Sequence, residues 1–128
     1  MLKVSDISAW LSALGVAPAP VDSAFLIPPQ PGRMIVLALA GGPGDTLERA
    51  FDRLALHVEC FGLQRQYADG EALATQVDNA ILGVTAPIRI GGTFVNDIDR
   101  IGAPPRFMGV DKSFRPAFGA TYLLQYAF

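Results

Sequence analysis

The segment from Leu54 to Phe61 most limits the folds open to this chain, because its apolar residues recur at every second position. Positions 54, 56, 58 and 60 hold Leu, Leu, Val and Cys, whereas positions 55, 57 and 59 hold Ala, His and Glu. Successive side chains of a strand point to opposite faces. The period of two therefore predicts a β-strand with one face in the protein core.

Two other segments have the period of an amphipathic helix. Asp6 to Leu14 is expected to form the first helix, with Ser5 as its N-cap and Gly15 ending it. The second is expected after Asp69 and before Gly83. It has an apolar stripe at Leu73, Val77, Ala80 and Ile81 and a polar face at Glu71, Gln76, Asp78 and Asn79.

Further strands are expected on both sides of the second helix. Met34 to Ala40 is a continuous apolar run that ends at Gly41, which predicts a strand buried on both faces. Three later segments are also predicted strands: Ile88 to Ile90, Phe94 to Ile101 and Ala117 to Phe128. Between the last two we expect a loop from Gly102 to Pro116, because it carries two consecutive prolines.

Two shorter segments have weaker patterns. Ala24 to Ile27, between prolines, fits an edge strand or a loop. Asp45 and Glu48 have the spacing of a capping box, so Thr46 to Phe51 could form one or two helical turns. Together the elements predict a single α+β domain over residues 1–128, with a mixed, mostly antiparallel sheet and two main helices packed on one of its faces.

The composition predicts that a partner covers part of the surface. Hydrophobic residues make up 51% of the chain and charged residues 17%, whereas about 25% charged residues is usual for a soluble domain. The run from Met34 to Ala40 is far shorter than a membrane span, and Asp6 interrupts any N-terminal signal. We therefore expect oligomerisation in the cytoplasm that made the protein, without a membrane. The net charge of −2 does not suggest DNA as a direct ligand.

Catalytic, cofactor and metal sites are not expected. Gly41 to Thr46 resembles a phosphate-binding turn, but it lacks a lysine, and Asp45 would repel phosphate. His57 lacks an orienting partner and is interpreted as a surface or interface residue. Cys60 is expected to be a buried, unreactive thiol. Asp97, Asp99 and Asp111 could bind a divalent cation, but Asp97 and Asp99 are interpreted as solvated charges near Arg100.

Interface residues are expected instead among the arginines and in the proline-containing loop. Arginine outnumbers lysine eight to two, a choice that interfaces favour, although a genomic base bias would produce it equally well. Apolar side chains on the irregular segment from Pro104 to Gly109 fit burial against a partner or against the chain's own core. The candidate interface residues are Arg65, Arg89, Arg100, Arg106, Phe107, Met108, Asp111 and Lys112.

The order of these elements resembles the tail-terminator, or minor-capsid, family of long-tailed bacteriophages. The resemblance is carried by Met34 to Gly44 (MIVLALAGGPG), Leu54 to Gly62 (LALHVECFG), the second helix, and the end segment Ile101 to Phe128. The end segment is similar to the family's Gly-x-Pro, then Gly-x-Asp, then a final strand rich in Tyr and Phe. Family members often carry an arginine directly after the alternating strand, whereas here Arg65 follows a few residues later.

This resemblance implies a non-enzymatic subunit of the virion neck. It would form a ring, expected to be a hexamer, that caps the tail tube and stops its polymerisation. Its partners would be other copies of the chain, the tail tube protein and the head-tail connector, with DNA only passing through the lumen. Two alternatives remain open from the sequence: a head-completion or stopper protein of the same neck, and a small ligand-binding domain or enzyme.

Overall fold

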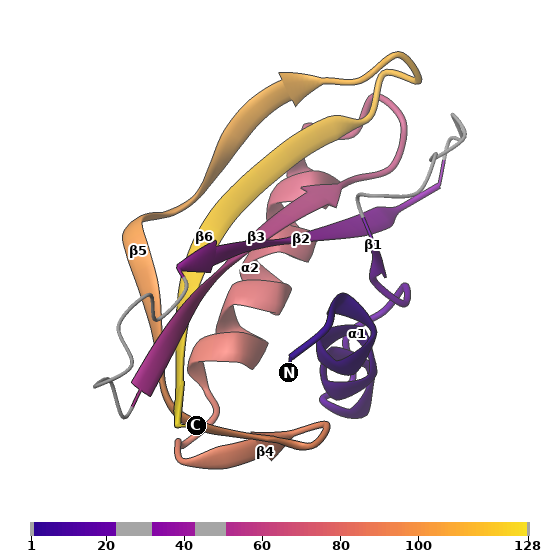
Figure 1. Ribbon diagram of the computed structural model, residues 1–128. Coiled ribbons are helices and arrows are strands. Elements are labelled where there is room, and N and C mark those ends of the chain that lie inside the picture. Colours follow the sequence, from indigo (N-terminus) through magenta and orange to yellow (C-terminus); the bar gives the residue numbers. More distant parts are fainter. Residues whose placement is uncertain (1, 23–31, 43–50, 128) are drawn as a thin grey trace.

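The computed structural model describes residues 2–22, 32–42 and 51–127, which form one curved, six-stranded sheet with two α-helices (Figure 1). The strand order is β1-β2-β3-β6-β5-β4. All neighbouring pairs are antiparallel except β1 and β2. The fold is therefore α+β with a mixed sheet, as predicted. Its elements are α1 (Val4–Ala13), β1 (Val21–Asp22), β2 (Met34–Gly42), β3 (Phe51–Phe61), α2 (Tyr67–Leu82), β4 (Ile88–Ile90), β5 (Thr93–Val110) and β6 (Pro116–Ala127).

β3 lies at the centre of the sheet and confirms the predicted alternation. Its residues at positions 54, 56, 58 and 60 are all buried in the core. On the other face, His57 lies between Ala38 of β2 and Thr121 of β6. In β2 the side chains from Met34 to Leu37 are all buried, so the prediction of a strand covered on both faces is confirmed for its first half.

Both helices pack on the same face of the sheet, which we call the inner face. α2 contacts β3, β5 and β6, whereas α1 contacts β1, β2 and β4. Because β1 and β4 are the two edges of the sheet, a helix that touches both shows that the sheet curls around its helices (Figure 1). The opposite, outer face is covered by no helix of the described residues.

The first helix begins earlier than the sequence predicts. Its N-cap is Lys3, not Ser5, and the Lys3 backbone N–H donates a hydrogen bond of 3.0 Å to the Asp6 carboxylate. An acidic group in the first turn is favoured there because the N-terminus of a helix is partly positive. The predicted end is correct: Gly15 has a φ of +90°, a conformation that glycine adopts without strain.

The predicted loop from Gly102 to Pro116 is wrong over most of its length, because β5 continues through it to Val110. The two prolines fall in a bulge, where the four residues between Ile101 and Arg106 oppose one residue of β6. β4 pairs with β5 only at residues 93–95, so beyond them β5 is an edge strand. Proline is tolerated at bulges and on edges because no ladder hydrogen bond is needed from its nitrogen.

Two weaker predictions fall outside the described residues, which omit 23–31 and 43–50. These are the extended segment Ala24 to Ile27 and the helical turns from Thr46, together with most of the glycine-rich turn. Phe51 itself begins β3. No helix of the described residues is both long and apolar enough to cross a membrane.

α2 is fixed to the sheet by a polar network around Asp78, which the sequence placed wrongly on an exposed face. The side chain of Asp78 accepts hydrogen bonds of 2.7 Å from the Tyr122 hydroxyl of β6 and the Arg100 guanidinium of β5. Asp78 and Tyr122 are both buried. Desolvation, together with the hydrogen bond to Asp78, raises the pKa of Tyr122 well above its usual value. A buried carboxylate is stable only with such partners, so the three residues hold α2 in register.

This network gives the first prediction. Tyr122→Phe removes a hydroxyl bound to a carboxylate, so we expect the free energy of unfolding to fall by about 1.5–3 kcal/mol. Asp78→Ala should cost more, because it also leaves the Arg100 charge unpaired. Urea denaturation followed by circular dichroism measures both. The control is Gln76→Ala on the exposed face of α2, expected within about 0.5 kcal/mol of wild type. If the Tyr122→Phe variant has the same free energy of unfolding as wild type, the network does not hold the helix.

Candidate interaction surface

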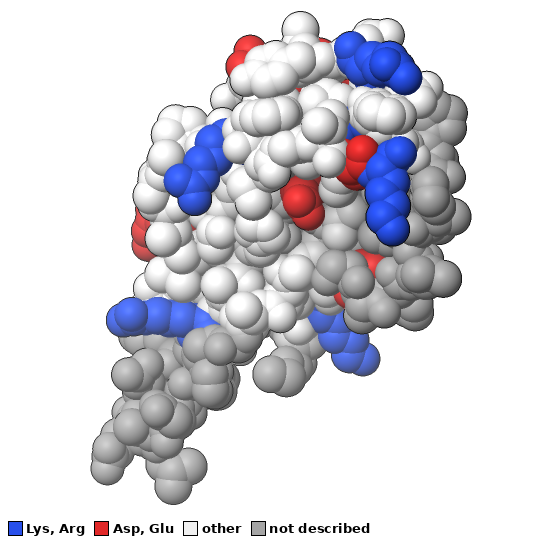
Figure 2. Space-filling model, turned by 90° about the horizontal axis from the view of Figure 1, so that it is seen from above, with Lys and Arg blue, Asp and Glu red and all other residues white. Residues whose placement is uncertain are grey.

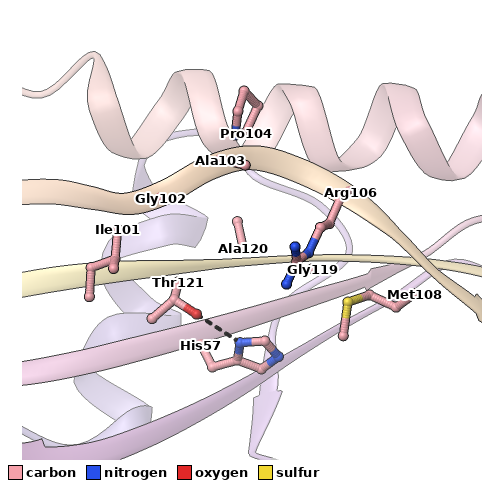
Figure 3. Close-up of a pocket in the computed structure, with 10 residues that line it drawn as sticks. All are labelled: His57, Ile101, Gly102, Ala103, Pro104, Arg106, Met108, Gly119, Ala120 and Thr121. Carbon is pink, nitrogen blue, oxygen red and sulfur yellow. Dashed lines mark hydrogen bonds between the residues drawn. The ribbon is translucent and has the colours of Figure 1, made fainter.

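The outer face of the sheet carries a pocket of about 210 Å³ where β3, β6 and the bulged part of β5 meet (Figure 3). Its lining combines small, apolar and polar groups from all three strands. The lining residues are His57, Ile101, Gly102, Ala103, Pro104, Arg106, Met108, Gly119, Ala120 and Thr121. Because directly opposed residues of neighbouring strands share a face, the β-sheet register brings these positions together from segments far apart in the chain.

Two polar side chains form the floor of the pocket. The Nδ1 atom of His57 lies 3.2 Å from the Thr121 hydroxyl oxygen, and the two residues are directly opposed across β3 and β6. This contact orients the ring and leaves its Nε2 atom for another partner. Beside them, a Cβ added to Gly119 would lie 3.3 Å from Met108 Cγ and 3.5 Å from His57 Cε1. The absence of a side chain at Gly119 therefore opens the space of the pocket.

Arg106 supplies the positive charge of the pocket. It lies opposite Gly119 at the end of the β5 bulge, and its side chain points from β5 toward Gly119, on the side where His57 lies (Figure 3). It is exposed, and none of the ion pairs among the described residues involves it. A guanidinium with free donors next to an imidazole and a hydroxyl is suited to bind a carboxylate or another oxyanion.

A second feature is an exposed apolar cluster around the end of the β5–β6 hairpin, which we call the hairpin-end patch. Tyr67, Phe107 and Phe118 form a cluster of rings with centroids 5.1–5.6 Å apart. Phe118 is buried, whereas Tyr67 is 52% and Phe107 47% exposed. The patch consists of Leu63, Tyr67, Phe107, Val110 and Phe114, all large and exposed. Exposed apolar groups collected at one place mark an interaction site.

Charged residues at this end of the molecule hold the turn and the adjoining loop in place. Desolvation alone would raise the pKa of Asp111, but hydrogen bonds from Arg115 and from the Ser113 N–H lower it overall. Arg65 has a positive φ of 61°, and its guanidinium lies 4.5 Å from the centre of the Phe114 ring. In the view of this end from above, the described surface is mostly uncharged, and basic side chains lie apart from one another around it (Figure 2).

The structure brings together most, but not all, of the predicted interface residues. Six of the eight belong to the hairpin or to the loop that contacts it: Arg65, Arg106, Phe107, Met108, Asp111 and Lys112. Arg89 is exposed on β4, outside this group. Arg100 lies outside this group as well, because its side chain pairs with Asp78 of α2 and not with the nearby Asp97 and Asp99.

Sequence reasoning did not place Tyr67 or His57 in these features. Tyr67 comes two residues before the predicted start of the second helix and gave no periodic signal. His57 was interpreted as a surface or interface residue. The structure places it, half-buried, beside Arg106, which is 49 positions later in the chain. A signal was present in the glycine at position 119, since a glycine inside a strand indicates a close approach.

The described residues contain neither a metal-ligating cluster nor an exposed thiol. Within residues 2–22, 32–42 and 51–127, no group of three or more metal-ligating side chains occurs. Cys60 is 2% exposed on the inner face of β3, and its burial, with a smaller contribution from the charge of Glu59, raises the pKa of the thiol to about 12. The expected inert thiol is therefore confirmed by its environment.

This environment gives a second prediction. At pH 8 the folded protein should react with a disulfide reagent such as DTNB about a thousandfold more slowly than the unfolded chain, because only the thiolate attacks. Thiol release followed by absorbance, with and without guanidinium chloride, measures this. Cys60 is the only cysteine, so the signal has one source. Rapid reaction of the folded protein would show that α2 leaves the inner face readily.

Comparison with known proteins identifies the fold. Over 94% of its length the chain superposes on 86% of a chain from the virion of a native gene transfer agent particle, with a TM-score of 0.66. The two sequences are 16% identical, so the likeness establishes a shared fold. No protein-family model matches the sequence. A search of curated proteins also found no match.

Proposed function

We propose that the chain is a structural subunit of a phage-type virion, acting by binding and without catalysis. The observation that carries the proposal is the fold shared with a chain of the gene transfer agent virion over nearly the whole length of both chains. The resemblance of the strands, second helix and end segment to phage tail terminators supports the same class of particle. The two arguments use different information, since one rests on backbone geometry and the other on residue patterns.

Within the virion we propose the neck as its position, as a tail terminator. In this role copies of the chain would form a closed ring, taken to be a hexamer. The ring would cap the tail tube, end its polymerisation and join the tail to the head connector, with DNA passing through the lumen. The support is the end segment from Ile101 to Phe128, which is one of the segments that carry the resemblance and which contributes most of the hairpin-end patch.

The surface of the molecule is suited to such a ring. A cyclic assembly buries complementary patches on every subunit. This chain offers two surfaces that no described element covers: the apolar hairpin-end patch and the outer face of the sheet with its pocket. Burial of the patch against a neighbouring subunit or the tail tube would remove exposed aromatic surface from water, which is the usual driving force of association.

Deletion of the gene in the phage that encodes it gives the third prediction. Particles should have overlong tail tubes and no attached heads, because no ring ends tube growth. Negative-stain microscopy, with tail length and head attachment scored separately, measures both effects. Expression of the wild-type gene from a plasmid is the control and should restore tails of normal length.

The other outcomes have definite meanings. Tails of normal length beside heads that have lost their DNA would replace the terminator by a head-completion or stopper protein. Intact, infectious virions would contradict any role in the neck.

A further inference from the structure

The outer face of the sheet carries an acidic pair as well as the basic pocket. Asp97 and Asp99 of β5 are exposed and lie opposite Gln125 and Leu123 of β6. No described residue forms an ion pair with either aspartate. The two carboxylates instead act on each other: charge repulsion from Asp97, together with a hydrogen bond between the two side chains, raises the pKa of Asp99. Among the described residues, the pair thus lacks a compensating cation.

The pocket, in contrast, has a positive charge that lacks an anionic partner within the described part of the chain. Arg106 has no acceptor among the described residues, so it still offers nitrogen donors. The Nδ1 atom of His57 is in contact with Thr121, which leaves its Nε2 atom for another partner. The Gly119 gap leaves room for a short side chain between them. A carboxylate can accept two hydrogen bonds from one guanidinium, which gives both energy and a fixed orientation.

The two sites cannot satisfy each other within one subunit. Asp99 lies opposite Leu123, whereas Arg106 lies opposite Gly119. These β6 residues are four apart in the strand, a separation of roughly 13 Å. The β5 bulge from Gly102 to Pro105 lies between the aspartates and the arginine. An ion pair needs a nitrogen and an oxygen within about 4 Å of each other. Contact between the acidic pair and the pocket therefore requires a second molecule.

We propose that the Arg106–His57 pocket is a receptor for the Asp97–Asp99 carboxylates of a second copy of this chain. Each subunit then offers both halves of the contact, a basic pocket and an acidic pair, as association between copies of one chain requires. The contact would cover the outer face of the sheet, on which no helix of the described residues packs. The inference rests on the self-association contained in the proposed function, but not on a role in a virion.

Charge complementarity favours this occupant. Both sites lie on the same open face, their charges are opposite, and neither is neutralised within the described part of the subunit. Complementary charges of this kind determine which surfaces meet and in which register. A free anion would satisfy Arg106 but would leave the acidic pair without a cation.

The experiment is a charge reversal with rescue, using sedimentation velocity of the full chain over a range of concentrations. Arg106→Glu alone and the Asp97→Arg/Asp99→Arg double variant should each weaken association about tenfold or more, because each places like charges in contact. The chain with all three substitutions should regain association to within about threefold of wild type, because the pairing is restored with its signs exchanged. Lys3→Glu and Glu71→Arg are the matched controls for charge at exposed positions on the helices, and neither should change association.

Three results would overturn the proposal: a wild-type chain that stays monomeric at its highest soluble concentration, reversals that leave association unchanged, or a triple variant that is not rescued. Melting temperatures of all variants show whether any loss is due to unfolding. The two proposals can fail separately. If the triple variant regains association in solution but phage that lack the gene still form normal virions, only the proposed neck function is wrong. If the gene deletion gives overlong tails but the charge reversals at Arg106 and at the acidic pair leave association unchanged, only the proposed pocket contact is wrong.

Discussion

The hydrogen bonds of the Asp78 carboxylate, 2.7 Å to the Tyr122 hydroxyl and 2.7 Å to the Arg100 guanidinium, are the contact on which the rest of the architecture depends. They join the middle of α2 to two neighbouring strands. A buried carboxylate with both partners is stable, whereas one shifted by a residue would lose them. These hydrogen bonds hold α2 against the inner face of the sheet, where it covers Cys60 and the other alternate residues of β3.

Because both helices pack on the inner face of the sheet, neither of them covers the outer face. Alternation along β3, β5 and β6 sends most large apolar residues inward, and the outer side carries Ala, Gly, Thr, His, Asp and Arg residues beside a few apolar side chains such as Ile101 and Met108. Such a face is too polar to be a second core layer, yet it has small residues, a pocket and separated charges. These are properties of a surface that binds another protein, and they support the proposed role of the chain as a subunit of an assembly.

The aromatic rings at the hairpin end depend on the same long strands. β5 and β6 pair over most of their length, and their far end carries Phe107 and Phe114 beyond the region that α2 covers. Tyr67, at the first turn of α2, reaches Phe107 there because the helix begins beside the hairpin. The patch and the pocket thus lie on the same hairpin, one toward its end and one on its outer face. In the proposed ring, these two surfaces would serve separate contacts with neighbouring subunits and with the tube.

The sequence by itself determined the strands and helices whose side chains repeat with a single period. Leu54 to Cys60, Met34 to Leu37, and Leu73, Val77 and Ile81 are placed as predicted, because burial of one face needs only local spacing. Only the tertiary structure decided three matters: Asp78 is buried, the two prolines lie in a strand, and His57 and Arg106 line the same pocket. Each depends on residues more than twenty positions away or on which strand lies at an edge. Local periodicity does not contain that information, because a polar side chain is buried or exposed according to its partners in space.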